Sequence, residues 1–439
     1  MIEKIILTPF QKFVKIESFS GILLFGATVI AMIWANSPFS ESYQALWQFN
    51  IGISTETFEF TKPLILWIND GLMAVFFFLI GLEIKRELLI GELNSLRKAT
   101  LPLFAAIGGM VFPLCLFLLL NNSPETISGW GIPMATDIAF TLAILKILGN
   151  RVPLSLKIFL TAFAIVDDLG AVLIIAIFYS TGIDWWLILY AMLPLALLFY
   201  LSYRGIYHKY LSFFIGIVVW FLFLGSGIHP TIAGVLMAFT IPIRQKIDME
   251  SFTENLQNIA YRFTQTKRDG LPILSKEQYE HMDELEGLTE KFNSPLQRLE
   301  HGLHGWVAYF IMPIFALSNA GVIFSADMAL DMPLVINIAV ALFIGKGIGI
   351  TMMSFLSVKL KIAVLPEGIN FIQIVGVAIL AGVGFTMSIF VANLAFTDNS
   401  VFVDSSKVGI LVGSVVSGII GYIIIKWSGN PKKTLIQKS

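Results

Sequence analysis

The sequence predicts an all-α integral membrane protein with about twelve transmembrane helices and a short external β-hairpin. Three observations carry this prediction: the apolar composition, the recurrence of apolar runs of membrane length, and the alternating charge of the segments between them. Of the 439 residues, 56% are hydrophobic and only 13% are charged, whereas a soluble domain carries about 25% charged residues. The net charge of -1 gives no indication of a nucleic-acid partner, and a single cysteine excludes an internal disulfide framework.

Twelve apolar runs have the length, about 17 to 25 residues, that crosses a bilayer. The seventh and eighth are separated only by the string GSGIHP. The first run follows Lys4, Lys12 and Lys15, so a signal peptide is the alternative, but its removal would spoil the charge pattern and we interpret it as a retained helix. The expected limits are 18–36, 63–83, 100–120, 129–149, 155–180, 184–203, 210–226, 229–243, 304–324, 333–357, 371–396 and 406–427.

The connecting segments alternate in charge. If both termini are cytoplasmic, nearly all of the 29 Lys and Arg residues lie in cytoplasmic segments or their flanks. The segments assigned to the outside carry acids instead, namely Glu41, Glu56, Glu59, Glu125, Asp327, Asp331, Asp398 and Asp404. Because basic residues are retained on the cytoplasmic side, the pattern predicts an even number of spans with both ends inside.

Two regions are expected outside the bilayer. The segment at about 49–61, FNIGISTETFEFT, alternates apolar and polar residues, which is typical of a two-stranded external hairpin. The segment 244–300 is polar with apolar residues at helical spacing, so we interpret it as a cytoplasmic insertion with two amphipathic helices; a mobile linker is the alternative. The expected divisions are helices 1–8 over 1–243, the insertion over 244–300, helices 9–12 over 301–427 and a cytoplasmic tail over 428–439.

Four ionisable residues lie deep within expected spans: Asp137, Asp167, Asp168 and Lys346. Such a group costs at least a few kcal/mol at mid-membrane and marks a functional site by default. The alternative is an ion pair that only holds helices together, but three carboxylates against one ammonium leave a surplus that this does not explain. Adjacent helical residues point about 100° apart, so one of the paired aspartates can face an ion pathway while the other faces a neighbouring helix. The glycines around Lys346, in FIGKGIGI, permit close helix approach.

Two expected spans carry signs of an interruption. Pro133 precedes Asp137 in WGIPMATDIAF, and Gly382 and Gly384 lie in AGVGFTMS. Interrupted spans in opposite halves of a chain are typical of a transporter's midplane site, although ordinary glycine-mediated packing is the alternative. Carboxylate and hydroxyl oxygens suit hard cations, and burial favours a protonated carboxyl group. A proton and a cation would therefore compete for one site, which couples their movements.

The charged residues belong to long, distinctive strings: LWINDGLMAVFFFLIGLEIKREL, ATDIAFTLAIL, LKIFLTAFAIVDDLGA, RLEHGLHGWVAY, LFIGKGIGI and GFTMSIFVANLAF. Through these strings, and over nearly the whole chain, the sequence resembles the NhaA family of sodium/proton antiporters. The resemblance implies twelve helices with an inverted-topology repeat, spans 3–5 against 10–12, and broken spans 4 and 11 that cross at mid-membrane. It also implies a multi-pass protein of the bacterial inner membrane that expels Na⁺ or Li⁺ against protons, is activated at alkaline pH and forms a homodimer through the external hairpin. No cofactor is expected.

The resemblance also implies roles for individual residues. Asp168 matches the family's principal ion-binding aspartate, and Asp167 matches a neighbour that can pair with the lysine matched by Lys346. Asp137 and Thr136 match positions beside the crossing, so that Na⁺ or a proton would be held among these residues. A pH-sensing cluster is matched by Glu83, Glu87, Glu300, His301 and His304, with His229 nearby. A solvated cytoplasmic charge patch is the alternative interpretation of that cluster. The insertion at 244–300 is longer than the resemblance leads us to expect.

Other functions that need buried carboxylates fit the pattern less well. An intramembrane aspartyl protease takes two aspartates from separate helices, whereas Asp167 and Asp168 are adjacent and no GxGD string occurs. A passive cation channel favours rings of charges or carbonyls over a site with a counter-lysine. A carrier of another cation is a third alternative, because the sequence does not rank Na⁺, Li⁺ and K⁺. We expect a secondary active transporter rather than an enzyme, electrogenic because its titratable groups exceed the charge of one cation.

Overall fold

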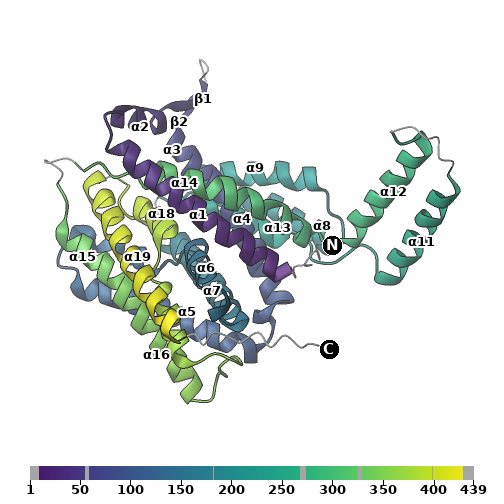
Figure 1. The fold of residues 1–439 in the computed structure, drawn as a ribbon. Helices are drawn as coiled ribbons and strands as arrows, with labels where there is room; N and C mark the ends of the chain where they lie inside the picture. The colour runs from purple at the N-terminus through teal and green to yellow at the C-terminus, as the bar shows by residue number, and fades with distance from the viewer. Residues whose placement is uncertain are drawn as a thin grey trace.

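A computed structural model describes residues 9–54, 59–180, 182–266, 273–324, 329–397 and 399–428. The described chain is mostly helical, with one small β-sheet and a two-helix arm that extends from the bundle (Figure 1). The predicted tail at 428–439 lies outside the described residues except for Ser428.

The helices follow one another along the chain with short connections. Those of the first half are α1 (Pro9–Ala35), α2 (Ser40–Trp47), α3 (Leu64–Leu66), α4 (Met73–Leu89), α5 (Leu96–Leu120), α6 (Ile138–Ile147), α7 (Leu154–Phe178), α8 (Trp185–Tyr203), α9 (Lys209–Gly225) and α10 (Thr231–Thr240). Those of the second half are α11 (Met249–Gln265), α12 (Lys276–Phe292), α13 (Pro295–Trp306), α14 (Met312–Asn319), α15 (Met332–Val340), α16 (Lys346–Lys359), α17 (Phe371–Leu380), α18 (Phe385–Ala395) and α19 (Ser400–Ser428).

Short segments of tighter or wider helix join or extend several of these helices. The π-helical segments are η1 (Trp67–Leu72), η5 (Val307–Ile311) and η6 (Ala341–Gly345). The 3₁₀ segments are η2 (Glu92–Asn94), η3 (Pro124–Met134) and η4 (Gly149–Arg151). π-Helical turns are frequent at functional sites, and η6 directly precedes Lys346.

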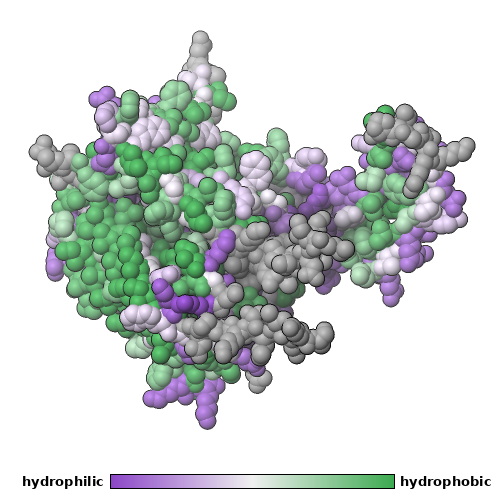
Figure 2. Space-filling view, viewed as in Figure 1, coloured by the Kyte–Doolittle hydropathy of each residue, from purple (hydrophilic) through white to green (hydrophobic). Residues whose placement is uncertain are grey.

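Six helical segments of the described chain are long and apolar enough to cross a membrane: Leu64–Leu89, Lys98–Leu120, Leu154–Phe178, Trp185–Tyr203, Met332–Lys359 and Ser400–Ser428. Three bent helix pairs also pass this test, and α9 and α10 are shorter apolar helices that fall within predicted spans seven and eight. Large apolar side chains are exposed on these helices (Figure 2), as expected for a lipid-facing surface; among them are Ile33, Leu119, Phe178, Trp186, Phe213 and Phe214. The chain is therefore a multi-pass membrane protein, while twelve spans and an inverted repeat stay predictions.

The described chain bends at both predicted interruptions. The pair η3 and α6 is bent by 47° and the pair α17 and α18 by 45°. The first break follows Pro133, and residues 135–137 are extended rather than helical. The second break covers residues 381–384, where a side chain at Gly382 would lie 2.5 Å from the Leu342 carbonyl oxygen. Close backbone approach thus requires glycine at this break.

A small antiparallel sheet lies at one end of the bundle. Strand β1 (Asn50–Ser54) pairs with β2 (Glu59–Pro63), with Ile53 opposite Phe60. Residues 55–58 of the predicted hairpin lie outside the described chain. We call this end of the bundle the hairpin end; α4 starts near it and ends at the opposite end.

The two-helix arm consists of α11 and α12 (Figure 1). The rings of Phe252 and Phe292 stack with their centroids 4.0 Å apart, and Ile259 and Leu288 are buried. The helical spacing in the sequence predicted both helices. Their described residues form a helical hairpin, while a cytoplasmic insertion over 244–300 stays a prediction.

Candidate functional site

The two helix breaks contact each other through their backbone and side chains. The Asp137 amide donates a hydrogen bond to the Val383 carbonyl oxygen at 2.8 Å. Asp137 also caps α6, because its Oδ1 accepts from the Phe140 amide at 3.1 Å. Its Oδ2 accepts from the Thr386 hydroxyl at 2.6 Å and from the Thr386 amide at 3.2 Å. The break of one helix pair is therefore joined to the break of the other by a buried carboxylate.

Lys346 meets this crossing from α16. Its Nζ lies 2.8 Å from Asp167 Oδ2 on α7, and both side chains are fully buried. The same ammonium group donates to the Thr136 hydroxyl, which in turn donates to the Ala381 carbonyl oxygen at 3.1 Å. The ammonium can approach because α16 packs closely on α5: a side chain at Gly349 would lie 2.2 Å from the Gly108 carbonyl oxygen.

Asp168 is buried but is not part of that pair. Within the described chain, its Oδ1 has no hydrogen-bond partner. The residue borders a cavity of about 40 Å³, together with Thr136, Asp137, Thr386 and Glu83. Such a volume accommodates at least one water-sized particle. The cavity therefore presents carboxylate and hydroxyl oxygens to a small hard cation or a proton.

A second cavity, of about 890 Å³, opens at the end opposite the hairpin. It is bordered by Arg86, Glu87, Glu300, His301 and His304. His304 Nδ1 lies 3.6 Å from Glu83 Oε1, and Glu83 borders the small cavity. Thr161 and Ile165 on α7 also line the large cavity. They lie about two turns and one turn before Asp168, respectively, on the same helix face. The two cavities thus approach each other along α7 and at the His304–Glu83 contact.

Arg86 organises the acids of the large cavity. Its guanidinium donates to Glu87 Oε1 at 2.8 Å and to Glu300 Oε1. Glu300 lies before the predicted ninth span, and burial raises its pKa from 4.5 to about 7, against the opposing effect of the Arg86 charge. The structure therefore brings together Glu83, Glu87, Glu300, His301 and His304, with Glu300 able to change its charge near neutral pH.

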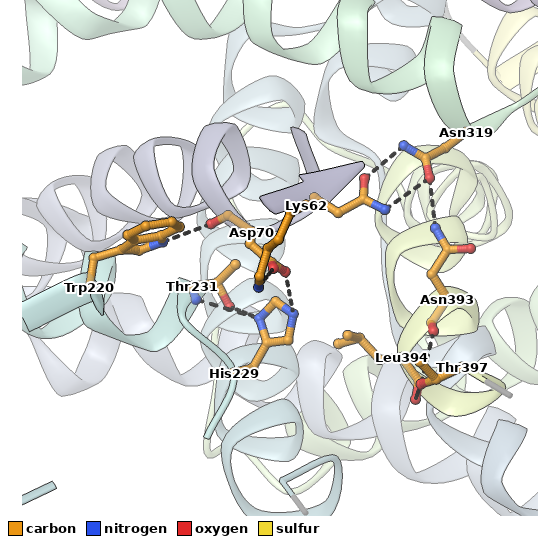
Figure 3. Close-up of polar contacts among 10 residues, drawn as sticks. Lys62, Asp70, Trp220, His229, Thr231, Asn319, Asn393, Leu394 and Thr397 are labelled. Atoms are coloured by element: carbon orange, nitrogen blue, oxygen red, sulfur yellow. Dashed lines mark hydrogen bonds and ion pairs between the residues drawn. The ribbon is translucent and has the colours of Figure 1, made fainter. Parts of the chain in front are cut away.

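His229 does not belong to that cluster, so its interpretation as a neighbour is wrong. Its Nε2 lies 3.6 Å from Asp70 Oδ1 and its Nδ1 2.8 Å from the Thr231 hydroxyl oxygen (Figure 3). Lys62 of β2 contacts the other oxygen of Asp70 at 3.3 Å. Asp70 and Glu83 are thirteen residues apart on one continuous helical segment, or about 20 Å at 1.5 Å per residue. Spacing along the chain could not reveal that His229 contacts Asp70, because His229 lies in a loop between two helices.

The sequence assigned no role to Arg86, and Thr386 appeared only within the string AGVGFTMS of the second predicted interruption. Arg86 was counted among cytoplasmic basic residues, yet its position three residues after Glu83 and one before Glu87 was a signal of an ion-pair network. The Thr386 hydroxyl lies 2.6 Å from Asp137 Oδ2. Its partner could not be derived from sequence, because the two residues meet only when the breaks cross.

Comparison with known proteins gives a consistent result. Residues 11–425 match the family model described as Na+/H+ antiporter 1. A Na(+)/H(+) antiporter NhaA of Oleidesulfovibrio alaskensis is 48% identical over 424 residues, which covers 96% of this chain and 94% of the relative. Proteins of that name from Koribacter versatilis and Bacteroides thetaiotaomicron are 44% and 43% identical, each over 96% of this chain and over 92% and 98% of the relative. The chain belongs to the Na+/H+ antiporter 1 family.

Proposed function

We propose that the protein is a secondary active transporter that exchanges Na⁺ for H⁺ at its buried aspartates. One observation carries this proposal: Asp168 and Asp137 border one small cavity with two threonines, while Lys346 neutralises the adjacent Asp167. The names of the relatives support Na⁺ and H⁺ as the transported ions. The oxygen-donor set also suits Li⁺, which we include as a substrate.

Competition between the ions supplies the coupling. Desolvation disfavours an isolated carboxylate, so Asp168 holds a proton when no cation is bound. A cation among the oxygens of Asp168, Asp137 and Thr136 favours the ionised carboxylate and displaces that proton. Because both ions cannot occupy the site together, each inward or outward passage must exchange one for the other.

Two protons are exchanged for each cation in this proposal, which makes the exchange electrogenic. Asp168 supplies one proton, and the coupled pair of Asp167 and Lys346 supplies the other. One net positive charge then moves inward per cycle, and about 100 mV adds roughly 2.3 kcal/mol to cation expulsion. The test is to impose a potential across vesicles while the pH gradient is held at zero. The potential should drive Na⁺ movement; if Na⁺ stays in place, a one-for-one exchange replaces this proposal.

Regulation and orientation complete the proposal. Both termini face the cytoplasm of a bacterial cell, and the arm and the large cavity lie on that side. The hairpin lies outside, where it joins a second copy in a homodimer.

Glu300 carries more negative charge as the pH rises through about 7. This change next to Arg86 and His304 supports activation at alkaline pH.

The exchange is tested with purified protein in vesicles. An outward Na⁺ gradient should drive proton uptake, and an outward proton gradient should drive Na⁺ uptake against its own gradient. A channel would pass Na⁺ without an opposing proton flux, so uncoupled Na⁺ movement would contradict the proposal. Parallel runs with Li⁺ and K⁺ rank the cations.

A further inference from the structure

We propose that Asn69, Asn319 and Asn393 form a latch that closes the ion site from the hairpin end and must open during each transport cycle. Asn69 lies in η1, Asn319 ends α14, and Asn393 lies in α18. We regard them as positioning residues, since none of them borders the small cavity. The inference rests on the proposed exchange function.

The three amides form one connected network (Figure 3). Asn319 Oδ1 accepts hydrogen bonds from Asn393 Nδ2 at 2.8 Å and from Asn69 Nδ2 at 3.2 Å. Asn319 Nδ2 returns a bond to Asn69 Oδ1 at 2.8 Å and donates to the Phe315 carbonyl oxygen at 3.0 Å. Asn319 is 1% exposed and Asn69 is 9% exposed. Three helical segments that are distant in sequence are thus held at one point by two buried amides and the half-buried amide of Asn393.

Helix α18 connects this network to the ion site. Thr386, Phe390 and Asn393 follow the spacing i, i+4 and i+7, so they lie on one helix face. Thr386 donates to Asp137 at 2.6 Å, and Asn393 lies about 10 Å further along the axis at 1.5 Å per residue. A movement of α18 that separates Asn393 from Asn319 therefore also displaces Thr386 relative to Asp137.

An apolar plug lies between the two ends of this face. Phe390 packs against Phe77 of α4 and Phe315 of α14, with ring centroids 5.6 and 6.2 Å apart, and all three side chains are buried. The three phenylalanine side chains exclude water from the ion site. The amides lie on the hairpin side of this plug, where contact with water is tolerated. In the closed state the amides bond to each other, and in an open state water can replace those bonds at a small net cost. An equilibrium of this kind suits a contact that must break and reform repeatedly.

Reversible cross-linking tests the latch. On a Cys115→Ser background, Asn319→Cys and Asn393→Cys are joined by an oxidant or a short bifunctional thiol reagent. We expect joining to reduce Na⁺/H⁺ exchange at least tenfold, reduction of a disulfide to restore it, and stabilisation by Na⁺ against heat to persist. Exchange at the rate of the unjoined protein would overturn the latch.

A matched control joins residues that are not expected to separate. Ile53→Cys and Phe60→Cys lie opposite each other in the sheet, and their cross-link should leave exchange unchanged. If the Cys115→Ser parent itself does not exchange Na⁺ for H⁺, the proposed function fails. The latch is then judged by the structural measurement that follows, which needs no transport.

Hydrogen exchange provides that measurement. Asn393→Leu keeps the size of the side chain and removes its hydrogen bond to Asn319. The backbone amides of α18 should exchange about five- to tenfold faster, the effect of losing roughly one hydrogen bond, while those of α17 should be unchanged. Asn393→Ser, which retains a donor, should show a smaller increase. Equal exchange of α18 in the wild type and in Asn393→Leu would overturn the latch.

Discussion

Two clusters of acids and bases in the described chain lie in different surroundings. Lys346 and Asp167 are both 0% exposed, whereas Arg86 is 27% exposed and its partner Glu300 is 11% exposed beside a large cavity. A charge in the first cluster can be balanced only by its partner, a proton or a bound cation. A charge in the second can also be stabilised by water. We call the first group, Lys346 with Asp137, Asp167 and Asp168, the dry cluster; it suits coupling between ions. We call the second group, Arg86 with the acids and histidines of the large cavity, the wet cluster; it suits a graded response to pH.

Removing a carboxylate from the small cavity tests the dry cluster most severely. Asp168→Asn and Asp137→Asn keep the side-chain shape but remove the negative charge. Each should reduce exchange to the rate of protein-free vesicles, because a neutral amide can neither release a proton nor balance Na⁺. Asp404→Asn, which removes a carboxylate near the start of α19 outside the site, is the control and should retain exchange. Near-normal exchange by correctly inserted Asp168→Asn would contradict its assigned role.

The Lys346–Asp167 pair should show the next largest effect, on stability as well as transport. Lys346→Ala leaves Asp167 buried without its partner, and a broken buried pair costs about 3–5 kcal/mol. Asp167→Asn should cost less when Lys346 is already alanine. Thermal unfolding of the two single variants and the double variant measures this coupling. Simple addition of the two losses would show that the residues do not act as a pair.

The wet cluster should respond to Glu300→Gln with a moved pH profile and a largely intact maximum rate. Burial raises the Glu300 pKa from 4.5 to about 7, so its folded form binds a proton more tightly than its unfolded form. Its contribution to stability is therefore greatest below about 4.5 and decreases as the pH rises to about 7. Glutamine stays neutral at every pH, so it removes both the pH-dependent loss of stability and the negative charge that forms near pH 7. Activation of Na⁺/H⁺ exchange should therefore need a higher pH. A lowered maximum with an unmoved midpoint would argue against a sensor.

The smallest effect is expected on the arm. Arg262 and Glu284 join α11 to α12, but each side chain is 47% exposed, and an exposed pair contributes about 0–1 kcal/mol. Arg262→Ala should leave both the rate and the pH midpoint of exchange unchanged. Its unfolding temperature, measured beside Lys346→Ala, sets the scale for the buried pair. A shifted pH midpoint would show that the arm takes part in regulation.

The sequence predicted the parts of the site that depend on local chemistry. Pro133 marked the first break and Gly382 the second, and the scarcity of charge identified Asp137, Asp167, Asp168 and Lys346. The contact of Thr386 with Asp137 and the amide network could not be derived, because both depend on how distant helices pack. A signal for the amide network did exist in the sequence, because single asparagines stand within expected spans, in WIND, ALSNA and FVANLAF. His229 was misplaced for the same reason, since its partner Asp70 is far away in sequence.

The central claim is that Na⁺ and protons compete for the same buried carboxylates. It is tested most directly by adding Na⁺ to purified wild-type protein in weakly buffered solution and recording proton release over a range of pH. The account predicts saturable release with Na⁺, an apparent Na⁺ affinity that weakens as the pH falls, and no release from Asp168→Asn. Saturable Na⁺ binding without proton release, or equal release from Asp168→Asn, would contradict it.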